Sequence, residues 1–125
     1  MKMRVRGNSI RLRLTQSEVE QFEKKGLVEE IIEFGERELI YALESSAKAE
    51  KVEAEFKDNR IVVIIPQNDA KRWANSNEVG IKTEYNISDE KTLQLLIEKD
   101  FACLEPREGE EDADTFPHPA GNEKC

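Results

Sequence analysis

Apolar and basic residues alternate through the first fourteen positions of the chain, with Gly7 and Asn8 in the middle. An alternation of period two predicts strands with two different faces, and a Gly-Asn pair between strands is typical of a tight hairpin turn. One face of the predicted hairpin is apolar, with the pairs Val5–Ile10 and Met3–Leu12. The other face is basic, with the pairs Arg4–Arg11 and Lys2–Arg13. Because like charges opposite each other destabilise a strand pair, we expect an anionic group to face them.

The next residues predict a capped helix followed by two more hairpins. Thr15 and Glu18 match a capping box, which predicts a helix from Gln16 to near Lys25 with Gly26 as its stop. Strand-like runs over 27–34 and 37–45 predict a hairpin with the pairs Ile32–Leu39 and Val28–Leu43. Runs over 51–57 and 60–65, around Asp58-Asn59, predict a third with the pairs Phe56–Ile61, Ala54–Val63 and Val52–Ile65.

After Pro66 the pattern predicts a short helix, a strand and another helix. Ala70, Trp73 and Ala74 recur at helical spacing, and we expect the lone Trp to cap the core. A strand is predicted over 79–87, and Ser88 suits the N-cap of a helix. That helix would bury Leu93, Leu96 and Ile97. Residues 101–104 are predicted to form a last short strand.

These elements place the chain in the α+β class. Hairpins joined in series predict a single antiparallel sheet of about seven strands, free to curl into a half-barrel, with three short helices. We interpret residues 1–104 as one domain and residues 105–125 as an acidic tail that contains Pro and Gly. No internal repeat is evident in the sequence.

Size and charge narrow the possible functions. A chain of 125 residues suffices for one core, and it has no apolar run near the length of a membrane-spanning helix and no visible secretory signal. We therefore expect a cytoplasmic protein. The net charge of -8 argues against non-specific binding to nucleic acid or to an anionic membrane. Two cysteines are too few for a disulfide framework.

The basic hairpin is the first candidate site, and its residues are Arg4, Arg6, Arg11 and Arg13. Guanidinium groups bind phosphate or carboxylate through paired hydrogen bonds, so these residues predict an anion-binding site. The alternative is pairing within the chain, with acids of the second and third hairpins: Glu29, Glu33, Glu38, Glu53 and Glu55. The acidic tail or an acidic partner protein is a third possibility. RNA binding is disfavoured because these strands lack aromatic residues for base stacking.

A second candidate site is the ExExK arrangement of Glu53, Glu55 and Lys57 on one strand face. Together with the segment SIRLR over 9–13, it is similar to the signatures of the triphosphate tunnel metalloenzymes. The resemblance implies that Glu53 and Glu55 hold a divalent metal such as Mg²⁺ and that Arg11 and Arg13 hold a triphosphate. The arrangement lies mid-chain instead of on the first strand, and the chain is short for a closed tunnel. A metal-dependent phosphohydrolase is therefore the alternative function.

The third candidate site lies in the tail. Cys103, His118 and Cys125 are residue types that bind zinc, although their spacing matches no known zinc finger. A buried free thiol and a solvated histidine are the competing interpretation, and we expect no cofactor. The chain has one histidine, no nucleophile elbow and no phosphate-binding glycine loop, so no catalytic residue is assigned.

Both ends of the chain resemble one group of proteins. The segments are RVRGNSIRLRLTQSEVEQF and KDFACLEPREGEEDADTFPHP, and they look like small uncharacterised bacterial proteins of a domain-of-unknown-function family. The resemblance implies a bacterial, single-domain, cytosolic protein, and it brings no functional residue with it. Our hypothesis is a binding or protein-interaction module whose basic face engages an acidic partner or the tail.

Overall fold

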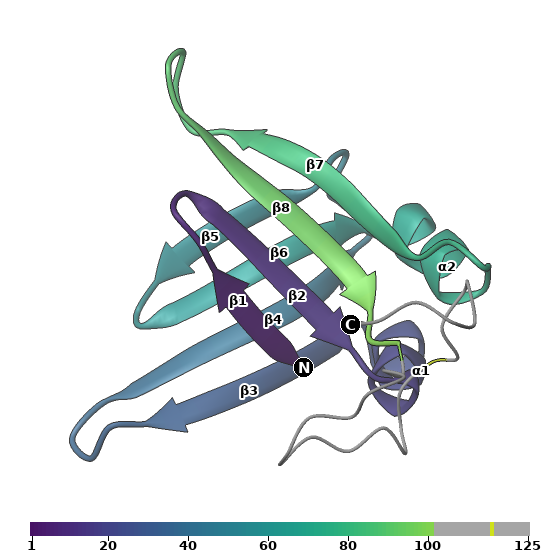
Figure 1. The fold of residues 1–125 in the computed structure, drawn as a ribbon, viewed down its shortest axis with the longest axis horizontal. Coiled ribbons are helices and arrows are strands. Elements are labelled where there is room, and N and C mark those ends of the chain that lie inside the picture. Colours follow the sequence, from purple (N-terminus) through teal and green to yellow (C-terminus); the bar gives the residue numbers. More distant parts are fainter. Residues whose placement is uncertain (102–115, 117–125) are drawn as a thin grey trace.

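Residues 1–101 fold into two sheets that pack face to face, with two helices at one end (Figure 1). The computed structural model describes residues 1–101 and residue 116. The first sheet has the strand order β1-β2-β8-β7, with bounds β1 (Lys2–Val5), β2 (Ser9–Leu14), β8 (Thr92–Lys99) and β7 (Gly80–Asn86). The second sheet has the order β3-β4-β6-β5, with bounds β3 (Leu27–Glu33), β4 (Glu38–Ser46), β6 (Arg60–Pro66) and β5 (Glu53–Lys57).

The predicted hairpins are confirmed with their registers. In the first, Arg4 pairs with Arg11 and Val5 with Ile10. The second pairs Ile32 with Leu39, and the third pairs Phe56 with Ile61. Asp58 and Asn59 both have positive φ, of 53° and 61°, as a tight turn requires. Val52, predicted opposite Ile65, precedes the first residue of β5.

The helix α1 (Gln16–Lys25) is confirmed with both of its caps. Thr15 and Glu18 form the predicted capping box. At the other end Gly26 adopts a left-handed conformation with φ 73°, and its backbone N–H donates to the carbonyl of Phe22 at 2.8 Å. The helix α2 (Gln67–Ala74) follows β6 directly, as α1 follows β2.

The prediction of a single antiparallel sheet with three helices is wrong. In each of the two sheets the central contact is parallel, between β2 and β8 and between β4 and β6. The helix predicted after Ser88 is the strand β8, and Ser88 lies in the turn before it. Leu95 and Ile97, on one face of β8, are both 1% exposed. The alternation of a strand therefore outweighs the cap-like signal, because β8 lies between two partners.

The fold contains an internal repeat that was not evident in the sequence. The units β1-β2-α1-β3-β4 and β5-β6-α2-β7-β8 have the same element order. Each sheet combines the first hairpin of one unit with the second hairpin of the other. The strand pairings match as well, since the second strand of each unit lies parallel to the last strand of the other. The two units are therefore topologically equivalent.

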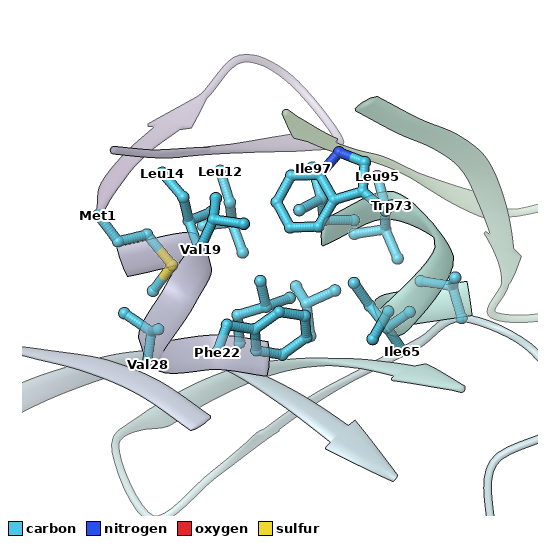
Figure 2. Packing of buried hydrophobic residues seen from close by; sticks show 14 residues of the cluster. Met1, Leu12, Leu14, Val19, Phe22, Val28, Ile65, Trp73, Leu95 and Ile97 are labelled. Atoms are coloured by element: carbon cyan, nitrogen blue, oxygen red, sulfur yellow. The ribbon is translucent and has the colours of Figure 1, made fainter. Parts of the chain in front are cut away.

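The hydrophobic core fills the space between the sheets, next to the helices (Figure 2). Leu12, Leu14 and Ile97 enter it from the first sheet, and Ile65 enters it from the second. Trp73, expected to cap the core, is fully buried within it, and its indole N–H donates to the carbonyl of Val79 at 3.2 Å. No helix among the described residues is long and apolar enough to cross a membrane.

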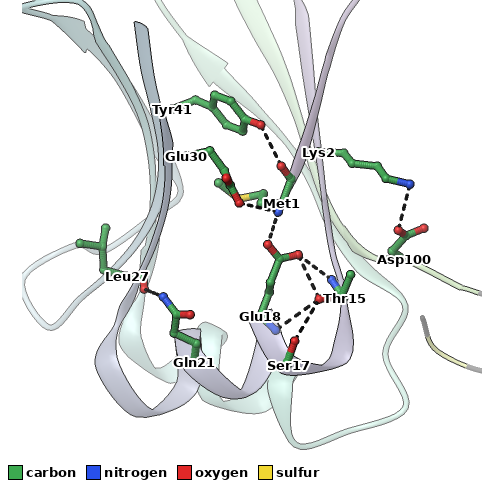
Figure 3. A network of polar contacts seen from close by, with 10 residues as sticks. All are labelled: Met1, Lys2, Thr15, Ser17, Glu18, Gln21, Leu27, Glu30, Tyr41 and Asp100. Carbon is green, nitrogen blue, oxygen red and sulfur yellow. Dashed lines mark hydrogen bonds and ion pairs between the residues drawn. The ribbon is translucent and has the colours of Figure 1, made fainter. Parts of the chain in front are cut away.

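A polar network joins the start of the chain to α1 and to the second sheet (Figure 3). The α-amino group of Met1 contacts the carboxylates of Glu18 and Glu30, the latter at 2.9 Å. The hydroxyl of Tyr41 donates to the carbonyl of Met1 at 2.9 Å. Burial acts to raise the pKa of Glu18, but hydrogen bonds from the α-amino group and from Thr15 outweigh it, so the pKa is lowered.

Candidate anion-binding site

The basic residues of the first hairpin lie on the outward face of the first sheet. Leu12 and Leu14 point into the core, so the residues that alternate with them on β2 point outward. The outward residues of β1 and β2 are mostly basic: Lys2, Arg4, Arg11 and Arg13. In the neighbouring strands β8 and β7, outward positions are held by Gln94, Leu96, Glu98, Lys82 and the acid Glu84.

At one end of this face the bases are paired with acids of the same sheet. The Nε atom of Arg11 lies 2.5 Å from Oε1 of Glu98. Nε of Arg13 lies 3.1 Å from the same oxygen, but it forms no hydrogen bond within the described part of the chain, so this is a charge contact. Lys2 Nζ lies 3.4 Å from Oδ2 of Asp100. Glu98 and Asp100 are 8% and 5% exposed, whereas their basic partners remain partly open to solvent.

These counter-ions differ from the expected ones. The acids expected to pair with the hairpin belong to β3, β4 and β5 and lie on the outward face of the second sheet. Glu29, for example, contacts Arg60 at 3.3 Å. The prediction that acids of the second and third hairpins neutralise the first is therefore wrong. The parallel pairing of β2 with β8 supplies Glu98 instead, directly beside Arg13.

The rest of the basic face surrounds a surface pocket of about 310 Å³. Its basic lining residues are Arg4, Arg6, Arg11 and Lys82. The other lining residues are Ser9, Ile10, Gln94, Leu95 and Leu96, so no acid among the described residues takes part in it. Within the described residues, the side chains of Arg4, Arg6 and Lys82 form no ion pair, in contrast to Arg11.

The pocket follows from one row of residues across the sheet. Arg4 lies opposite Arg11, and Arg11 lies beside Leu96. Leu96 in turn lies opposite Lys82. An apolar side chain is thus flanked by bases, and Gln94 offers an amide nearby. This arrangement suits an anionic group attached to an apolar stem, because guanidinium and ammonium groups bind carboxylate or phosphate oxygens.

Three of the four predicted anion-binding residues line this pocket, and Arg13 does not. Lys82 is the residue that the sequence reasoning missed. It is brought next to the first hairpin only because β8 inserts between β2 and β7. Because a helix was predicted in place of β8, the sequence reasoning had no strand to connect β7 with the first hairpin, and so it could not place Lys82 near Arg11.

The residues of the tunnel-like alternative are not brought together. Glu53 and Glu55 lie on β5, on the outward face of the second sheet. Arg11 and Arg13 lie on the outward face of the first sheet, on the far side of the core. Among residues 1–101 and 116, no group of three or more histidines, cysteines or acids is placed to hold a metal. Cys103, His118 and Cys125 lie outside the described residues.

The model of one protein family matches residues 1–120, nearly the whole chain. Its description is "Family of unknown function (DUF7009)", which confirms the predicted resemblance to a family of unknown function. Neither the search of curated proteins nor that of solved structures finds a match.

Proposed function

The chain belongs to DUF7009, a family of unknown function, and we propose that it acts as a protein-interaction module whose basic pocket binds an acidic segment of a partner in the cytoplasm. One observation carries the proposal. Arg4, Arg6 and Lys82 line one pocket whose described lining residues include no acid, on a chain with a net charge of -8. Bases gathered in this way repel one another, so an anionic ligand relieves that repulsion when it binds.

The pocket favours binding over catalysis. Its lining among residues 1–101 includes no histidine and no carboxylate, which are the usual groups for proton transfer. Its charged groups are donors of hydrogen bonds and of positive charge, and the outward side chain of Leu96 gives it apolar surface. A glutamate-rich segment has the matching chemistry, because each carboxylate is carried on a short apolar stem.

A binding assay with labelled oligoglutamate tests the proposal. The variant Arg4→Glu/Lys82→Glu places acids in the pocket and should weaken binding at least about tenfold. Lys57→Glu/Lys71→Glu is the matched control, because it makes the same change of net charge at exposed lysines that do not line the pocket. Its affinity should stay near that of the parent. Equal weakening by both variants would mean that only net charge matters.

The acidic tail is the competing occupant from within the chain. In the full chain, neutral amides can replace the tail acids Glu108, Glu110, Glu111, Asp112 and Asp114. If the tail occupies the pocket, this variant should bind oligoglutamate more tightly than the parent, because the competitor is lost. An unchanged affinity would show that the tail does not occupy the pocket, and a separate partner would then be the expected ligand.

Tripolyphosphate is the probe for the phosphohydrolase alternative. That function predicts a rise in melting temperature that requires Mg²⁺, together with release of phosphate. Binding that is independent of Mg²⁺ and without turnover would assign the phosphate to the basic pocket as a simple anion.

A further inference from the structure

The internal repeat makes the two outward faces comparable position by position. In the first sheet one row of paired residues reads Arg4, Arg11, Leu96, Lys82. The equivalent row of the second sheet reads Glu55, Val62, Ala42, Glu29. Both ends of the row therefore change from base in the first sheet to acid in the second.

The neighbouring row shows the same inversion at its outer end. Lys2 begins this row in the first sheet, and Glu53 begins it in the second. Over the whole outward face of the second sheet, acids outnumber bases. The bases are Lys57 and Arg60, and the acids are Glu29, Glu33, Glu38, Glu44, Glu53 and Glu55. Of these acids, only Glu29 forms an ion pair within the described part of the chain.

We propose that the acidic outward face of a second copy of this chain docks on the basic outward face of the first. The inference rests on the proposed function, for which it names the partner. Both faces are four-stranded sheets with the same order of parallel and antiparallel contacts, so their acids and bases occupy matching places. The row that runs from Arg4 to Lys82 has a base at both ends, and the row that runs from Glu55 to Glu29 has an acid at both ends. Bases therefore meet acids whichever way one of these two rows is laid over the other.

Apolar residues on both faces support this contact. Leu96 lies in the middle of the basic row, and Ile31 of the acidic face is 52% exposed. Stacked sheets bring such side chains together at a spacing of about 10 Å. The two faces differ, so the contact is heterologous, or head-to-tail. In a pair of molecules, one basic face and one acidic face remain unoccupied. Association should therefore continue beyond a dimer, and salt should weaken it.

Complementary charge-reversal variants test the proposal by sedimentation velocity. Arg4→Glu/Lys82→Glu makes the basic face acidic, and Glu53→Lys/Glu55→Lys makes the acidic face basic. The parent should form species larger than a dimer at roughly 50 mM salt, where screening is weak. Each variant alone should be monomeric at concentrations at least about tenfold higher than those at which the parent associates. An equimolar mixture should associate again, because each variant offers the face that the other lacks.

The mixture separates this inference from the proposed function. Failure of the mixture to associate, or a parent that stays monomeric, would overturn the head-to-tail contact. If such a monomeric parent still bound oligoglutamate through the pocket, the proposed function would stand without it. Circular dichroism checks that each variant is folded. Association in the mixture would show independently that both variants are folded.

Discussion

Glu18 illustrates how one residue serves two neighbouring parts of the molecule. Its carboxylate accepts a hydrogen bond from the backbone N–H of Thr15 at 3.0 Å and so completes the cap of α1. The same carboxylate contacts the α-amino group of Met1, whose side chain is part of the core. The capping role was predictable from Thr15 and Glu18 alone, because it needs only a spacing of three residues. The contact with Met1 depends on tertiary structure, so it could not be predicted from a local sequence pattern.

The substitution Glu18→Gln should lower the free energy of unfolding by about 1–2 kcal/mol, because it removes a charged cap and an ion pair. Urea unfolding at neutral pH measures the loss. Glu20→Gln is the control, since Glu20 is exposed on the same helix and should change stability little. A loss as large for Glu20→Gln would contradict this role of Glu18.

Acid should remove the difference between Glu18→Gln and the parent. The pKa of Glu18 is lowered in the folded protein, so its carboxylate stabilises the fold above the unfolded value of 4.5. This contribution is lost as the pH falls through the lower, folded pKa. Urea unfolding of the parent and of Glu18→Gln, measured from neutral pH to below pH 4.5, should therefore give free energies of unfolding that become more alike as the pH falls. Curves that stay equally far apart in acid would show that charge is not the cause.

At the scale of elements, the two helices meet through a pair of aromatic rings at equivalent places. The ring centroids of Phe22 and Trp73 lie 6.2 Å apart, with 67° between the ring planes. Both residues are fully buried. An edge-to-face pair adds to the burial of apolar area, so this contact helps to hold the two helices together.

Truncation of Phe22 to Ala should cost about 3–5 kcal/mol, because it leaves a cavity beside Trp73. Trp73 is the single tryptophan of the chain, so its fluorescence reports unfolding directly. Phe34→Ala is the control, since Phe34 is 69% exposed and should lose little stability. Similar losses for both variants would argue against the core position of Phe22.

The strand β8 allows a direct test of strand against helix. In the predicted helix Leu96 was buried, whereas in the strand Leu95 is buried at 1% exposure and Leu96 faces outward. Leu95→Ala should therefore cost about 2–5 kcal/mol, and Leu96→Ala should cost clearly less. Thermal and urea unfolding of the two variants measure this order. The reverse order would favour the helix.

Local sequence patterns predicted the turns and helix caps, because these features depend on residues that are close in sequence. The hairpin around Gly7 and the helix ending at Gly26 were predictable because turns and caps involve only a few adjacent residues. The parallel contacts of β8 with β2 were not, since residues far apart in sequence form them. The candidate site was therefore half predictable: Arg4 and Arg11 followed from the hairpin, whereas Lys82 and the counter-ion Glu98 needed β8 in place.

At the scale of the whole molecule, neither unit of the repeat completes a sheet by itself. Each sheet needs hairpins from both units, and the parallel contacts join them at the centre. Unfolding should therefore be a single cooperative transition over residues 1–101. Urea curves followed by Trp73 fluorescence and by far-ultraviolet circular dichroism should coincide. Two separate midpoints would show that the units unfold independently.

The central place of β8 also has a consequence during synthesis on the ribosome. The hairpin of β1 and β2 emerges first, but the partner for the inner edge of β2 follows more than half the chain later. Until then an open strand edge and the apolar side chains of Leu12 and Leu14 remain uncovered. Pairings between distant strands form slowly, so nascent chains stalled before residue 92 should be especially prone to aggregate and to recruit chaperones.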